Sequence, residues 1–248
     1  MRFALVASLA LLFASNALAA PTPVDSGTFI VSQGERRLGT EVFVVQGRGD
    51  SLLMTSLVEH TVPTPDGDVP LEKSSFLVAS LFDFGLRRYD SHQIFRNRRL
   101  SRSVQVAETT LTIYRELDKA GNADVIAAPP GRLFIIDPMM FSLFDLMCLS
   151  LHERTFETRP LSVLVLGPSD SLLQARVTDL GTETIRWGER TIQARKLQIG
   201  DDQTSFFAWV DPKGAMLRLH QPQQDLRVER RPPAVKKRAP RPAKPPGG

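Results

Sequence analysis

The feature that most constrains the fold is a succession of short β-type runs, separated by glycine- and proline-containing turn signals, from residue 28 to residue 229. This spacing is typical of an all-β sandwich or barrel. Apolar Leu173, Ala175 and Val177 alternate with polar residues, which predicts a strand with one face in water. Around Phe207 and Trp209 both faces are apolar, which predicts a central strand. Further strands are expected at 28–33, 38–46, 52–61, 71–81, 86–95, 100–108, 111–117, 133–137, 161–166, 182–187 and 191–199.

A turn signal interrupts the last apolar runs. In Asp211-Pro212-Lys213-Gly214, the proline suits the second position of a type I turn, and the glycine suits a left-handed position. The sequence therefore predicts a hairpin over residues 204–220.

One segment departs from the β pattern. Asp137 is suited to cap a helix that has Pro138 at its first position, and residues 139–152 contain neither glycine nor proline. The apolar residues of this segment surround nearly the whole circumference, which is typical of a buried helix or of one that covers something apolar. We expect one buried helix near residues 138–152.

The start of the chain has the order of a secretory signal peptide. Arg2 precedes an apolar run at 3–14, and Ala17 and Ala19 form an A-x-A site that predicts cleavage before Ala20. The alternative is a membrane anchor, but the run is shorter than the roughly 20 residues needed to span a bilayer. The single cysteine, Cys148, excludes an internal disulfide and does not follow the cleavage site, where a lipid anchor would require it. We expect a periplasmic or secreted protein, soluble after signal cleavage.

The end of the chain, residues 231–248, is basic and rich in proline. It has too few large apolar residues to bury a core, which predicts an extended tail. The expected organisation is a signal peptide at 1–19, a single β-rich domain at 20–230 and the tail at 231–248. The tail is either a solubilising end or a contact with an anionic membrane surface, and its basic residues are Arg231, Lys236, Lys237, Arg238, Arg241 and Lys244. Because the excess positive charge lies in this tail, no nucleic-acid partner is expected.

The inventory of catalytic and metal-binding motifs is empty. None of the four histidines stands in a metal-ligand spacing, and glycine loops for phosphates or dinucleotides are missing from the sequence. Ser142, Asp145 and His152 fall on one side of the expected helix, but Asp145 and His152 are about 10 Å apart along its axis, too far for a hydrogen-bonded relay. The sequence therefore predicts no catalytic residue, no metal and no cofactor.

The methionines and aromatic residues of the expected helix are candidates for contact with an apolar ligand. Methionine repacks easily around ligands of variable shape, although ordinary core packing explains the same residues. We take Met140, Phe144, Met147 and, on the expected central strand, Trp209 as the candidate ligand-binding residues.

Three stretches resemble a family. They are Gly34 with Gly39-Thr40-Glu41, then Gly188-Glu189-Arg190 with Ala194-Arg195-Lys196-Leu197, and the stretch from Phe207 to Gly214 with Leu217-Arg218. They resemble uncharacterised bacterial exported proteins of the domain-of-unknown-function kind and, more distantly, the LolA/LolB lipoprotein-carrier superfamily, which folds as a curved antiparallel sheet over an apolar cavity.

The resemblance implies binding and not catalysis, and it supplies no catalytic residues. With the β pattern, it leads us to expect a mainly β fold, a strongly curved antiparallel sheet that forms a half-barrel or open barrel around the helix. The expected function is binding of an apolar or lipidic envelope component. The alternatives are an envelope scaffold that engages a protein partner through a sheet edge, and an unrecognised hydrolase.

Overall fold

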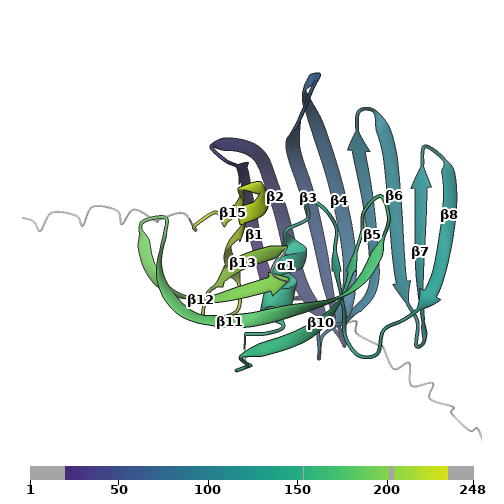
Figure 1. Ribbon diagram of the computed structural model, residues 1–248. Coiled ribbons are helices and arrows are strands. Elements are labelled where there is room, and N and C mark those ends of the chain that lie inside the picture. Colours follow the sequence, from purple (N-terminus) through teal and green to yellow (C-terminus); the bar gives the residue numbers. More distant parts are fainter. Residues whose placement is uncertain (1–19, 153, 201–203, 234–248) are drawn as a thin grey trace, which may run out of the picture.

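A computed structural model describes residues 20–152, 154–200 and 204–233. Within these residues, fifteen strands form one sheet in the order β8-β7-β6-β5-β4-β3-β2-β1-β15-β14-β13-β12-β11-β10-β9. The sheet is open, with β8 at one edge and β9 at the other. The expected mainly β fold is confirmed (Figure 1).

The first half of the chain is a meander of antiparallel hairpins that runs outward from the middle of the sheet. Its strands are β1 (Thr22–Gln33), β2 (Arg36–Arg48), β3 (Ser51–Thr64), β4 (Gly67–Ser80), β5 (Leu86–Phe95), β6 (Arg98–Val106), β7 (Thr110–Leu117) and β8 (Ala120–Ala127).

The second half starts at the far edge and returns to the middle. Its elements are β9 (Leu133–Ile136), α1 (Ser142–Leu149), β10 (Thr158–Val165), β11 (Ser171–Trp187), β12 (Arg190–Gly200), β13 (Ser205–Val210), β14 (Met216–Gln221), a 3₁₀ turn (Pro222–Gln224) and β15 (Leu226–Arg230). The β9–β10 pair is parallel and the other strand pairs are antiparallel. The two halves join where β15 pairs with β1, with Val31 opposite Val228.

Helix α1 lies on the inner side of the curved sheet, with strands of the first half behind it and strands of the second half in front (Figure 1). All eight residues of α1 are buried. The inward-facing apolar residues of both halves form one core with those of α1, and this core includes Phe29, Phe43, Tyr89 and Met147. A smaller cluster, Ile185, Ala194, Trp209 and Leu217, packs separately.

The helix is shorter than expected, because it begins at Ser142 and not at Pro138. Met139 has a left-handed φ of 68°, which is incompatible with a helical turn, and the Asp137 carboxylate is engaged with strand residues and does not cap the helix. The expected cap at Asp137 and the expected start at Pro138 are therefore wrong. At its other end, α1 stops at Leu149 and not at residue 152.

The hairpin expected over residues 204–220 is confirmed as β13 and β14. Gly214 has a φ of 86°, its backbone N–H donates to the Asp211 carbonyl over 2.9 Å, and the Asp211 carboxylate accepts from the Lys213 and Ala215 N–H groups. A Cβ at Gly214 would also lie 2.4 Å from the Cβ of His152. Glycine is thus required here by both conformation and space.

The observed strands differ from the expected ones in two ways. The runs expected around Leu173 and at 182–187 are parts of one long strand, β11, with an irregularity between Asp179 and Thr182. Strands β8 and β15 were not among the expected strands. Central β13 is apolar on both faces as expected, because Ala208 and Val210 join the main core while Trp209 joins the smaller cluster.

Candidate functional site

A carboxylate from a distant strand caps helix α1. Glu41 on β2 is fully buried, and its oxygens accept hydrogen bonds from the backbone N–H groups of Phe141 at 2.6 Å and Ser142 at 3.1 Å. These N–H groups have no partner within the helix, since they belong to its first turn. Burial raises the pKa of Glu41 to about 7, although its hydrogen bonds to Ser142 and Phe141 oppose the shift. Nearby, the Ser142 and Ser56 hydroxyls are 2.6 Å apart, which adds a second link to the sheet.

A second buried carboxylate gathers residues of β4, β5 and β6 around the end of β9. Asp137 pairs with Lys73 and accepts hydrogen bonds from the Tyr89 hydroxyl at 2.7 Å and the Ser91 hydroxyl at 3.1 Å. Arg102 Nη1 lies 3.4 Å from the same carboxylate. Burial lowers the pKa of Lys73, and Asp137 opposes that shift. Asp137 thus compensates two cations inside the core, an arrangement that fixes the position of β9 against the first half of the sheet.

A third buried carboxylate holds the other half of the molecule to the helix. Asp145 on α1 accepts a hydrogen bond from the Met216 N–H at 2.6 Å, and its second oxygen lies 3.6 Å from Arg230 Nη2. Arg230 also pairs with Asp25 on β1. Burial raises the pKa of Asp145 well above its usual range. Ser142 and Asp145 are therefore engaged with different partners, an arrangement unlike that of a catalytic triad.

The structure does not bring the four expected ligand-binding residues together. Met140, Phe144 and Met147 are buried in the main core around α1, where Phe144 packs against Phe206 with ring centroids 4.7 Å apart. Trp209 lies in the smaller cluster, and its indole N–H donates to the Glu183 carboxylate.

Of the basic tail residues, only Arg231 lies within the described residues. Its backbone N–H donates to the Thr28 carbonyl at 2.8 Å. The expected anionic-surface residues Lys236, Lys237, Arg238, Arg241 and Lys244 lie outside the described residues.

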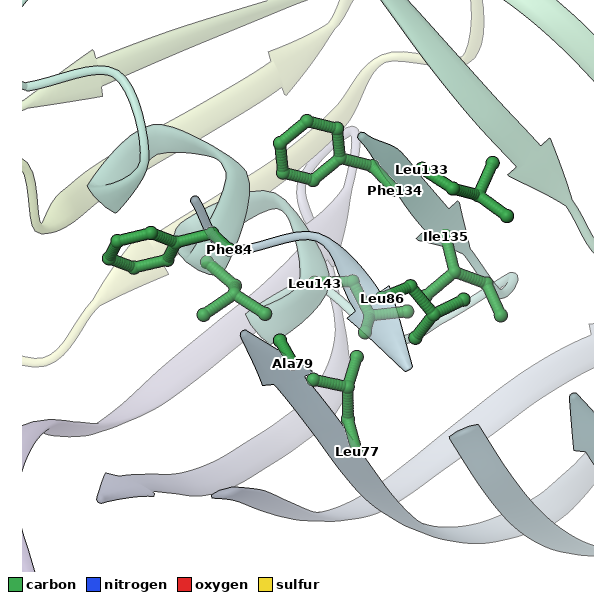
Figure 2. A pocket seen from close by; sticks show the side chains of 9 residues that line it. Leu77, Ala79, Phe84, Leu86, Leu133, Phe134, Ile135 and Leu143 are labelled. Carbon is green, nitrogen blue, oxygen red and sulfur yellow. The ribbon is translucent and has the colours of Figure 1, made fainter. Parts of the chain in front are cut away.

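Beside α1, packing leaves little free volume. Figure 2 shows apolar side chains of β4, β5, β9 and α1, among them Leu77, Leu86, Ile135 and Leu143, around a void of about 10 Å³. Such a void has room for about one water molecule, whereas ligand pockets measure roughly 300–1,000 Å³. A groove of about 650 Å³ lies farther out, between β6–β8 and the segment Gly167–Asp170. The space in the described part of the chain that is large enough for a ligand therefore lies away from the helix.

The outermost strand of the first half, β8, is the second candidate feature. All eight of its residues are exposed, and Val125 is 65% exposed. Its hydrogen-bonded neighbour is β7, and its other side has no strand partner among the described residues. The opposite edge differs, because three of the four residues of β9 are buried. The one charged residue of strand β8 is Asp124, and the strand carries no lysine, arginine or proline, which often protect an edge strand from pairing.

The buried carboxylates and the edge strand were missed from the sequence for different reasons. Glu41 shares the inward face of β2 with Phe43 and Val45, and Lys73 shares that of β4 with Leu71 and Leu77. A charge at an inward-facing strand position was thus a usable signal. Strand β8 offers no such signal, since both of its faces are exposed and its first half consists of small and polar residues.

Comparisons with protein-family models, curated proteins and solved structures found no match to this chain. The resemblance to the exported proteins and the LolA/LolB superfamily therefore stays a prediction. Within residues 20–152, 154–200 and 204–233, no group of three or more histidine, cysteine, aspartate or glutamate residues is placed to hold a metal ion. In the same part of the chain, no helix has the length and apolar character needed to cross a membrane.

Proposed function

We propose that this protein is a non-catalytic scaffold of the cell envelope that binds an extended protein segment by strand addition at β8. The observation that carries the proposal is the exposure of all eight β8 residues beside an unpaired edge. An exposed edge offers a row of backbone N–H and C=O groups, and an extended partner strand satisfies them. Side chains of such a strand would alternate between the two faces of the sheet.

The rest of the molecule supports this role because it is built to hold its shape. The carboxylates of Glu41, Asp137 and Asp145 join the inner helix region to strands from both halves of the sheet. In this proposal the sheet is a strongly curved half-barrel, α1 is its filled interior, and β8 is presented at its rim. A rigid scaffold lowers the entropy that is lost on binding.

Binding of an apolar or lipidic component in the concavity is the weaker proposal. The void beside α1 is far smaller than a lipid chain, so a lipid would have to displace the helix from its two carboxylate anchors, Glu41 and Asp145. Contact of the basic tail with an anionic membrane surface is compatible with either role, because it would position the protein without using the concavity.

Site-specific photocrosslinking tests strand addition. A photoreactive phenylalanine analogue at Val125 on β8 should form an adduct with a protein in cells that export the chain. The matched control is the same analogue at Val42, which is exposed on β2 in the interior of the sheet. Ala123→Pro should abolish the Val125 adduct, because proline removes a backbone N–H on the free edge of β8.

The fold of the Ala123→Pro variant is checked by circular dichroism and a thermal melt. No adduct at Val125, or equal adducts at Val125 and Val42, would contradict the proposal. Mass spectrometry of the adduct identifies the partner and shows whether it is a protein or a lipid.

A further inference from the structure

We infer that the strand added to β8 is β8 of a second copy of this chain, antiparallel, with Ala123 facing Ala123 across a two-fold axis. The inference rests on the proposed function, because it requires that the β8 edge accept a strand. It adds the identity of the partner and the register of the pair.

The hydrogen bonds of the β7–β8 hairpin determine which residues are free to pair. Its turn is formed by Asp118 and Lys119, which have φ of 48° and 77°, and Leu117 is opposite Ala120. At the other end, the Ala128 N–H donates to the Thr109 carbonyl at 3.0 Å. Since bonding alternates along an antiparallel ladder, the even-numbered residues of β8 bond to β7. The backbone groups of Gly121, Ala123, Val125 and Ala127 therefore point to the free edge.

Two copies that pair through these edge-facing groups have only a few registers. With Ala123 opposite Ala123, Gly121 faces Val125 in both directions, which gives about six hydrogen bonds between the copies. The paired stretch runs from Ala120, opposite Ile126, to Ile126, opposite Ala120. The continuous sheet keeps the same inner and outer faces in both copies.

The charges of β8 favour this register. It places Asn122 directly opposite Asp124 on the inner face, so an amide donor meets a carboxylate twice. Asp124 pairs with Arg115 of its own chain at 2.6 Å. Shifting the strands so that Asp124 faces Asp124 would still set two carboxylates directly opposite each other, which is less favourable than an amide opposite a carboxylate. The shift in the other direction pairs a shorter stretch, from Ala120 to Asp124.

The outer face is complementary in shape. A Cβ at Gly121 would lie 2.5 Å from the Tyr114 hydroxyl oxygen, so the absence of a side chain leaves room for the tyrosine ring over β8. In the proposed register, Val125 of the second copy lies opposite this glycine. Val125 and Tyr114 are 65% and 37% exposed in the single chain, and the pair would cover both. An aromatic side chain beside a β-branched one across strands is a stabilising combination.

Disulfide trapping tests the register. Under mild oxidation, Ala123→Cys should give a covalent dimer, because residues that face each other in a hydrogen-bonded pair have Cα atoms about 5.5 Å apart, within the range of a disulfide. The matched control is Asn122→Cys, which is also exposed on the same strand. Its Cα would lie about 8 Å from its symmetry mate, beyond that range. The native Cys148 is buried and stays in both variants.

Sedimentation of the otherwise unaltered chain should show a dimer, and Asn122→Asp should raise its dissociation constant about 2- to 30-fold, because it places two like-charge pairs across the interface. A chain that stays monomeric at high concentration, with no cross-link at Ala123→Cys, would overturn self-pairing. So would a cross-link as strong at Asn122→Cys. A Val125 photoadduct with a different protein would leave strand addition standing while this inference fails.

Discussion

At the scale of single residues, the molecule depends on carboxylates placed where a sequence pattern predicts apolar side chains. Local spacing predicts a helix cap at Asp137, which the structure contradicts, whereas Glu41 caps the helix from 100 residues away. Sequence reasoning from local spacing could not find this cap, because the partners meet only after the sheet has formed. The position of Glu41 on the inward-facing side of a predicted strand does indicate that its side chain is buried.

The raised pKa of Glu41 predicts a pH dependence of stability. In the unfolded chain this carboxyl has a pKa near 4.5, and in the folded chain about 7, so between these values the unfolded state binds fewer protons. Its contribution to the free energy of unfolding therefore falls as pH rises from about 4.5 to 7. Glu41→Gln does not titrate. Its unfolding free energy relative to the wild type should rise from pH 5 to pH 7 by about 2 kcal/mol.

Urea denaturation of both proteins at pH 5, 6 and 7 measures this difference, and Glu59→Gln, exposed on β3, is the control. Comparison with the wild type is needed because burial lowers the pKa of His60 to about 4, which makes stability rise with pH between about 4 and 6.5. A constant difference between wild type and Glu41→Gln at all three pH values would show that Glu41 is not held as a neutral group.

At the scale of elements, periodicity predicts the strands that have a clear apolar pattern or turn signal, and it misses elements that lack one. The β13–β14 hairpin followed from its turn residues, and most strands of the first half followed from their apolar runs. The start of α1 could not be predicted from composition, because Met139 adopts a left-handed conformation under tertiary constraints. In β15, Leu226 and Val228 face the core while Arg227 and Glu229 are exposed. This alternation covers only five residues next to the basic tail, which is too few for the sequence to predict a strand.

Helix α1 should behave as tightly packed core. Phe144→Ala should cost about 3–5 kcal/mol and Met147→Ala about 2–5 kcal/mol of unfolding free energy, because both side chains are buried in the main core. Trp209→Ala, in the smaller cluster, is the comparison and should cost about 3–5 kcal/mol. Chemical denaturation measures all three. Costs well below these at α1, together with an apolar fluorescent probe that binds the wild type, would instead support a ligand cavity.

At the scale of the whole molecule, the described residues form one sheet around one main core, and the expected domain limits at 20 and 230 stay a prediction. The structure refines where the tail should begin. Arg231 bonds to Thr28, and a Cβ at Gly188 would lie 2.8 Å from Pro232 Cγ, so Pro232 packs against the β11–β12 turn.

Two truncations should therefore differ. Removal of residues 234–248 should leave the melting temperature unchanged, because this segment has too few large apolar residues to contribute to a core. Removal of residues 231–248 should lower the unfolding free energy by about 1 kcal/mol, the net contribution of one backbone hydrogen bond. Paired thermal and urea melts decide between them. A large loss on removal of 234–248 alone would show that this segment docks on the folded part.

The pairing of β1 with β15 has a consequence for the order in which the chain matures. A chain made from its N-terminus completes the β1–β8 meander early, yet the inner edge of β1 has no neighbour until residues 226–230 emerge, almost 200 residues later. Until then the sheet of the nascent chain has two unpaired edges, β1 and β8, and an incomplete core. Such a state is prone to aggregation. Joining such distant segments also slows folding. A chain with this topology is therefore expected to need protection from aggregation until its last strand has been made.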